Sequence, residues 1–208
     1  MSERIHHSPN WMLWVLWVAA STLATLSAWG ATYSTIAGLK ATTLIRGLQE
    51  DQVLMPIFVL AVALLLAVLQ WIVIRRYVFQ ARQWIGFSLG GWGAAIGMLI
   101  LASRAGGVVA QISIQPEMMP YGMFAIMGFA LGSTQWLFLR RDVPNAGWWI
   151  PASIVGWLLA GLVIGPSINH LAEMAVLGTA PAVVTGATLV WLLRQPPKAA
   201  VLVRKHAV

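Results

Sequence analysis

Residues 70–92 read QWIVIRRYVFQARQWIGFSLGGW, and residues 135–157, which begin 65 positions later, read QWLFLRRDVPNAGWWIPASIVGW. The two stretches agree at Gln-Trp, Arg-Arg, Ala, Trp-Ile, Ser and Gly-Trp. Long apolar runs flank each stretch. The sequence therefore predicts a membrane hairpin that occurs more than once.

The composition of the chain is typical of an integral membrane protein. Of its 208 residues, 59% are hydrophobic and 9% are charged, whereas a soluble domain carries about 25% charged residues. Residues 53–74 contain no charge, and a spanning helix needs roughly 20 such residues. The net charge of +7 would suggest nucleic acid as the partner of a soluble protein. Here the charges lie between apolar runs, so we expect the lipid bilayer as the partner and no nucleic acid.

Six apolar segments predict an all-α integral membrane fold with six transmembrane helices. They cover approximately residues 10–36, 53–74, 83–103, 120–139, 147–166 and 169–193. An even number of spans brings both termini to one side, and that side receives ten of the 13 Lys and Arg residues. Such a bias sets orientation, so we expect both termini to be cytoplasmic.

A weaker third copy of the pattern extends the repeat to the whole chain. Trp17 precedes Ser21 by four residues, as in the two stretches above, and residues 190–194 (VWLLR) resemble residues 135–140 (QWLFLR). Hairpins that run in the same sense form a parallel repeat. We expect one transmembrane domain over residues 1–208, with hairpins at approximately 10–76, 80–141 and 146–195 and a short basic tail at 196–208.

The pattern Gln-Trp-Leu-x-Leu-Arg-Arg, followed by Trp-Trp-x-x-x-Ser, resembles a family of uncharacterised bacterial multi-spanning membrane proteins built from such hairpins. The resemblance is strongest over residues 125–165, weaker over residues 65–95, and returns at residues 185–194. It implies a helical fold in the bacterial cytoplasmic (inner) membrane and carries no activity. The family's returning helices have glycines before Gln-Trp. The fourth segment follows this rule with Gly128 and Gly132, and the second segment has no glycine.

Four polar residues are predicted to lie at similar depth inside the membrane. They are candidates for interhelical contacts, because a buried amide or hydroxyl needs a partner. We expect Gln–Ser hydrogen bonds that join neighbouring hairpins, and a polar substrate site is the alternative. The residues are Gln70, Gln135, Ser88 and Ser153.

Two arginine pairs follow the Gln-Trp motifs, where the helices leave the hydrocarbon. Their side chains are expected to extend to lipid phosphates and to fix the position of the helices. A binding patch for anionic lipid head groups or for an acidic partner is the functional alternative. The candidate head-group contacts are Arg75, Arg76, Arg140 and Arg141.

The other positions that recur in the repeated pattern are occupied by tryptophan and glycine. Six of the 12 Trp residues are predicted at the cytoplasmic interface, where indoles form an aromatic belt; these are Trp71, Trp84, Trp136, Trp148, Trp149 and Trp191. Trp92 and Trp157 lie deeper and are expected to fill gaps between helices or to stack on a pigment or quinone. Glycines four residues apart are expected at helix contacts; the pairs are Gly86 and Gly90, Gly93 and Gly97, Gly128 and Gly132, and Gly161 and Gly165.

The sequence contains no recognisable catalytic set. None of its six Asp and Glu residues falls at the centre of a predicted span, which argues against a proton-coupled carrier. The absence of cysteine excludes thiolate chemistry. His170 and Glu173 can share a helix face, either as a helix-end pair or as part of a ligand site. We expect neither an enzyme nor a bound metal or cofactor.

Three hypotheses of function remain open. The leading one is a structural or accessory subunit, whose partners are other membrane proteins. The second is a small transporter or channel, because three parallel hairpins can enclose a central path. The third is a protein that binds lipid, quinone or pigment. The outer loops, residues 38–52 and 106–119, are candidates for interfacial helices, a lid or a docking surface.

Overall fold

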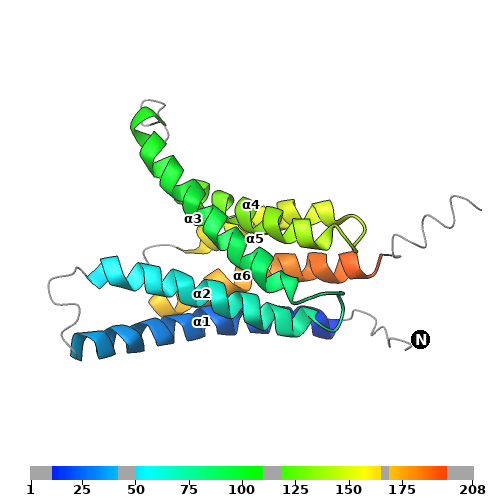
Figure 1. Cartoon of the computed structure of the whole chain (residues 1–208), viewed down its shortest axis with the longest axis horizontal. Coiled ribbons are helices and arrows are strands. Elements are labelled where there is room, and N and C mark those ends of the chain that lie inside the picture. Colours follow the sequence, from blue (N-terminus) through cyan, green and yellow to red (C-terminus); the bar gives the residue numbers. More distant parts are fainter. Residues whose placement is uncertain (1–10, 42–49, 110–118, 165–168, 196–208) are drawn as a thin grey trace, which may run out of the picture.

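The computed structural model describes residues 11–41, 50–109, 119–164 and 169–195, and every regular element in them is helical (Figure 1). Six of the helices are long and apolar enough to cross a membrane, which confirms the prediction of an all-α fold with six candidate spans. The elements are α1 (Trp11–Ala41), α2 (Glu50–Ile74), α3 (Gln83–Val109), α4 (Met119–Leu139), a 3₁₀ turn η2 (Ala146–Trp148), α5 (Trp149–Val163) and α6 (His170–Leu193).

Three of the six predicted C-terminal helix ends differ from the observed ones. α1 continues to Ala41 and α3 to Val109, so parts of the expected outer loops are helical. A helix that continues keeps its backbone groups paired, which favours extension wherever no strong stop occurs. α5 ends earlier, at Val163, because Pro166 follows and a proline restricts the residue before it. Residues 42–49 and 110–118 of the outer loops and residues 196–208 of the tail lie outside the described part of the chain.

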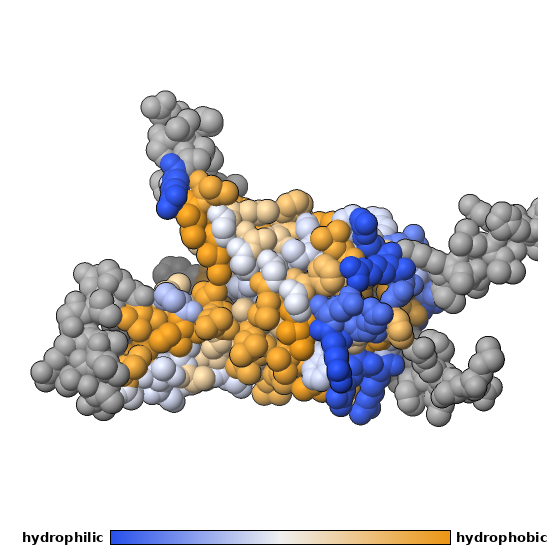
Figure 2. Space-filling view, in the orientation of Figure 1, coloured by the Kyte–Doolittle hydropathy of each residue, from blue (hydrophilic) through white to orange (hydrophobic). Residues whose placement is uncertain are grey.

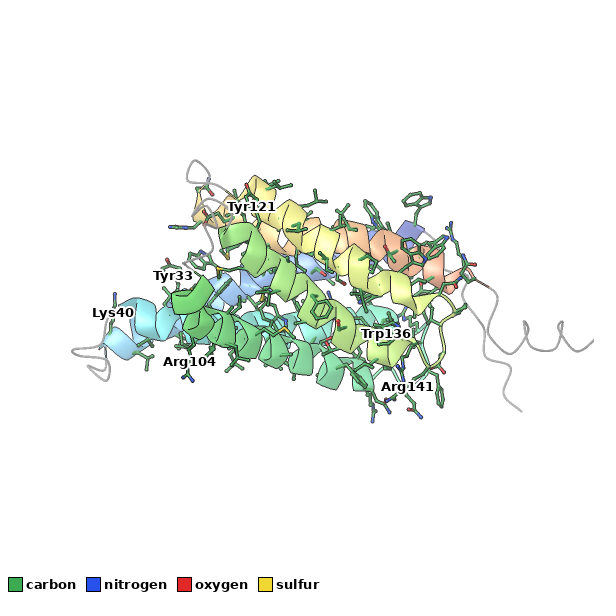
Figure 3. The ribbon with its side chains drawn as sticks, turned by 90° about the horizontal axis from the view of Figure 1, so that it is seen from above. Tyr33, Lys40, Arg104, Tyr121, Trp136 and Arg141 are labelled. Carbon is green, nitrogen blue, oxygen red and sulfur yellow. The ribbon has the colours of Figure 1, made fainter. Side chains whose placement is uncertain are left out.

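The six helices form a ring in chain order. Each helix packs against the next, and α6 packs against α1 to close the ring. The described chain starts and ends at the same end of the bundle (Figure 1). Polar residues gather at that end (Figure 2). Trp136 and Arg141 lie there, whereas Lys40 and Arg104 lie at the opposite end (Figure 3). We call the former the Arg-rich end.

Glycines allow most of the close contacts in the ring. A Cβ atom on Gly128 would lie 2.6 Å from the Cα of Ile154, and one on Gly178 would lie 2.7 Å from the Cα of Thr22. A Cβ atom on Gly156 would lie 2.8 Å from the Cα of Pro181. Backbones this close exclude any side chain, so α4–α5, α6–α1 and α5–α6 are tightly packed.

The contact between α2 and α3 is the sparsest in the ring. The C-terminal part of α3 diverges from the bundle (Figure 1). Within residues 83–104 of α3, Ala95 is the last buried residue, and residues 96–104 are half-buried or exposed. The glycine-free α2 therefore meets its neighbour loosely on one side of the ring.

Candidate functional site

Three indoles meet at the centre of the ring near the Arg-rich end. Trp17 of α1, Trp84 of α3 and Trp149 of α5 are at most 1% exposed. Their centroids are 5.7 Å apart for Trp17–Trp84, 5.9 Å for Trp84–Trp149 and 6.0 Å for Trp17–Trp149. All three contacts are edge-to-face, an arrangement that favours the positive edge of one ring against the negative face of another. These residues, which we call the indole triad, close the axis of the bundle.

The assignment of Trp84 and Trp149 to an aromatic belt is wrong. Both rings are buried at the axis, because each lies on the same helix face as the buried serine four residues later, Ser88 or Ser153. The i, i+4, i+8 spacing of Trp84, Ser88 and Trp92 was the available sequence signal. Among the other predicted belt residues, Trp148 is 62% and Trp191 44% exposed, as a belt position requires.

The two glutamines form hydrogen bonds to serines on neighbouring helices. Gln135 Nε2 donates to Ser88 Oγ at 3.1 Å, and Gln70 Nε2 donates to Ser21 Oγ at 3.1 Å. Both bonds join the two helices of one hairpin, whereas we expected bonds between hairpins. The reason is the antiparallel turn, which brings the Gln near the end of one helix level with the Ser near the start of its neighbour. Ser153 instead donates to the carbonyl of Trp149 in its own helix.

Several links between hairpins come from indole N–H groups. Trp149 Nε1 donates to Gln135 Oε1 at 3.0 Å, so that Gln135 connects α3, α4 and α5. Trp17 Nε1 donates to Thr185 Oγ1 of α6 at 3.1 Å. Trp84 Nε1 is buried without a hydrogen-bond partner among the described residues. The indole links thus bridge α4–α5 and α6–α1, and no such link joins the described residues of α2 and α3.

A small polar chamber lies beside the indole triad. Its volume is about 40 Å³, enough for about two or three water molecules. The polar side chains that line it are Ser21, Ser88, Ser153, Gln70, Gln135 and Thr185. Four of these residues were predicted from the sequence as interhelical contacts. Ser21 was noted only as a repeat position equivalent to Ser88 and Ser153, and Thr185 was not predicted.

The deeper tryptophans close the chamber on the side away from the triad. Trp92 and Trp157 are each 8% exposed and meet edge-to-face with centroids 5.9 Å apart. Phe124 stacks on Trp157 at 6.3 Å. The indoles therefore contact protein rings, as expected of residues that fill gaps between helices.

The four candidate arginines lie at the Arg-rich end on exposed positions. Arg75 lies over Trp71 at 5.4 Å, and Arg140 lies over Trp136 at 5.0 Å, in cation–π geometry. Arg141 donates to Gln83 Oε1 and lies over Phe87 at 5.3 Å. The two Arg-Trp pairs therefore have similar local geometry, and Arg141 links the turn after α4 to α3.

His170 and Glu173 form a helix-end pair. The Nδ1 of His170 is 3.0 Å from Glu173 Oε2, and the histidine side chain is 74% exposed. Asn169 caps the same helix by accepting from the backbone N–H of Ala172 at 2.9 Å. In the described part of the chain, no three His, Asp or Glu side chains gather as a metal site requires.

No protein-family model, curated protein or solved structure matches this chain.

The two glutamines are expected to differ in their contribution to stability. Gln135→Leu removes the acceptor of Trp149 and the donor to Ser88, so we expect a loss of about 1–3 kcal/mol in the free energy of unfolding. Gln70→Leu breaks one interhelical bond, with an expected loss of about 0.6 kcal/mol and at most about 1.7 kcal/mol. SDS titration followed by circular dichroism measures both losses in the free energy of unfolding. Equal losses would contradict the connection of α3, α4 and α5 through Gln135.

Proposed function

We propose that this protein is a non-enzymatic integral membrane protein that serves as a structural or accessory subunit of a membrane assembly. In this proposal the ring is a rigid scaffold, and a transmembrane helix of another subunit docks on the outer face of α3. The proposal is supported by the contrast between the glycines inside the ring and those on α3.

Four glycines on α3 carry the proposal. Gly86, Gly90, Gly93 and Gly97 follow a 4-3-4 spacing, which aligns them on one helix face. A Cβ atom on any of them would have no atom of another helix within 4 Å. We expected these glycines to pack inside the bundle, and that expectation is wrong: the inner face of α3 is occupied by Trp84, Ser88 and Trp92. Small residues let helices approach closely in membranes, so this face suits a helix from outside the ring.

The finer topology belongs to the same proposal. Three parallel-repeat hairpins with both termini in the cytoplasm are supported by the ten-to-three division of Lys and Arg residues. They are also supported by the matched Trp–Ser spacing on α1, α3 and α5. Membership of the uncharacterised bacterial family that the pattern resembles, and a location in the bacterial inner membrane, are proposed on that resemblance.

The two rival hypotheses have less support. A transporter or channel needs a path along the axis, whereas the indole triad fills the axis and the chamber beside it measures about 40 Å³. A pigment or quinone would stack on Trp92 or Trp157, whereas these rings contact each other and Phe124.

Leucine on the α3 glycine face is expected to release the partner. The double variant Gly90→Leu/Gly93→Leu blocks close approach of a second helix without a clash inside the ring. We expect the companion protein that co-purifies from native membranes in mild detergent to be lost, while the thermal midpoint stays unchanged. Native gel electrophoresis and mass spectrometry measure the companion.

Gly30→Leu is the matched control, because Gly30 of α1 is also exposed with no atom within 4 Å of its Cβ position. It should retain the companion. A wild-type chain that migrates alone, or a double variant that keeps its companion, would contradict the proposal.

A further inference from the structure

The loop between α2 and α3 forms a basic hollow at the Arg-rich end. Its volume is about 490 Å³, and its walls include Arg75, Arg76, Arg82, Trp71 and Phe79. All three guanidinium groups lie on exposed positions, and residues 75–82 contain no Asp or Glu. An anion that enters this hollow meets a charge of +3 with no competing acid in the loop.

The equivalent loop between α4 and α5 differs in charge. Residues 140–147 align with residues 75–82 at the 65-residue spacing and carry two arginines and Asp142, a net charge of +1. Tyr77 occupies the place of Asp142, and Arg82 occupies the place of Gly147. A general requirement for positive charge near the membrane applies to both loops, so it does not account for the excess in the first.

The backbone of the basic hollow is held in place. Val78 and Ala81 are buried, and Gln80 adopts a left-handed conformation with φ of 53°. Tyr77 N donates to the carbonyl of Ile74 at 2.9 Å, and Gln83 Nε2 donates to Gln80 Oε1 at 2.7 Å. The cation–π contact with Trp71 orients Arg75. A preorganised loop loses less entropy when a ligand binds.

We propose that residues 75–82 form a binding site for an anionic phospholipid with two phosphodiester groups in its head group. Guanidinium groups bind phosphate oxygens with charge-assisted hydrogen bonds, and three of them match two phosphates better than one. Phe79 is 55% exposed beside them, a position from which its ring contacts the glycerol and acyl region of a lipid. This site uses none of the glycines of the docking face on α3, and the two proposals share only the requirement that the protein lies in a bilayer.

Native mass spectrometry of the full chain in detergent tests the site, with cardiolipin, phosphatidylglycerol and inorganic pyrophosphate as probes. We expect one cardiolipin to bind more tightly than phosphatidylglycerol or pyrophosphate. Near an anionic head group each Arg raises the binding affinity by a factor of about five. Arg76→Gln/Arg82→Gln removes two such residues and should therefore weaken cardiolipin binding about 25-fold.

Arg140→Gln/Arg194→Gln is the matched control, since it removes the same charge from the same end and keeps the Arg141–Gln83 hydrogen bond beside the hollow. It should change the affinity less than about threefold. Equal weakening by both double variants would show diffuse surface attraction and overturn the site. If phosphatidylglycerol binds as tightly as cardiolipin, the preference for two phosphates is wrong. If pyrophosphate binds as tightly as cardiolipin, the ligand is a soluble phosphate and the lipid site is wrong. Both variants keep the α3 glycines, so loss of lipid with retention of the companion protein separates this inference from the proposed subunit role.

Discussion

Trp149→Ala is expected to lower the free energy of unfolding by about 3–5 kcal/mol, the range for removal of a buried tryptophan. Trp149 is 1% exposed and contacts both other indoles of the triad. Its loss also leaves Gln135 Oε1 without the indole donor. Circular dichroism during SDS titration is the appropriate measurement, because it does not depend on tryptophan fluorescence.

Two further variants separate packing from hydrogen bonding at this position. Trp149→Phe keeps an aromatic ring and removes the N–H donor, so an intermediate loss of about 1–3 kcal/mol is expected. Trp148→Ala removes the neighbouring indole, which is 62% exposed, and should cost less than about 1 kcal/mol. If Trp148→Ala and Trp149→Ala were equally destabilising, the buried triad would be wrong.

Gly128→Leu is expected to destabilise the protein by about 3 kcal/mol or more, at or beyond the upper end of the usual cost of overpacking. The new Cβ atom would lie 2.6 Å from the Cα of Ile154 and 2.8 Å from the carbonyl oxygen of Ser153. Because both are backbone atoms, no rotamer change relieves the clash, and α4 must separate from α5. The folded fraction after purification and the thermal midpoint measure the effect.

Gly122→Leu is the control on the same helix. Gly122 is exposed, and a Cβ atom there would have no neighbour within 4 Å. Its substitution should leave the folded fraction and the thermal midpoint unchanged. Comparable damage from both variants would contradict the tight α4–α5 contact.

The number of spans could be predicted because hydropathy is a local property of each segment. Six runs of about 20 apolar residues are sufficient evidence for six helices. The helix ends could be predicted only where a strong stop occurs, as at Arg75 and Arg140. α1 and α3 each continue between one and two turns beyond the expected hydrocarbon boundary, since no proline interrupts them there.

The partners of the site residues could be predicted less well, because they depend on the orientation of each helix about its own axis. The sequence indicated that Gln135 and Ser88 would find partners, but the third participant, the N–H of Trp149, comes from a residue expected at the interface. The four-residue glycine spacing is the same in Gly128 and Gly132 as in Gly86 and Gly90. Only the three-dimensional arrangement separates the first pair, against α5, from the second, which faces outward.

A disulfide between the first and last helices tests the closed ring most directly. The hydroxyl oxygens of Thr22 and Thr179 are 2.8 Å apart, and the chain has no native cysteine. Thr22→Cys/Thr179→Cys should therefore form an intramolecular disulfide in membranes under mild oxidation. Thr188 lies nine residues further along α6, about 13 Å away along its axis, so Thr22→Cys/Thr188→Cys should stay reduced. A folded Thr22→Cys/Thr179→Cys variant that stays reduced, or equal linkage of both pairs, would contradict a ring closed by α1 and α6.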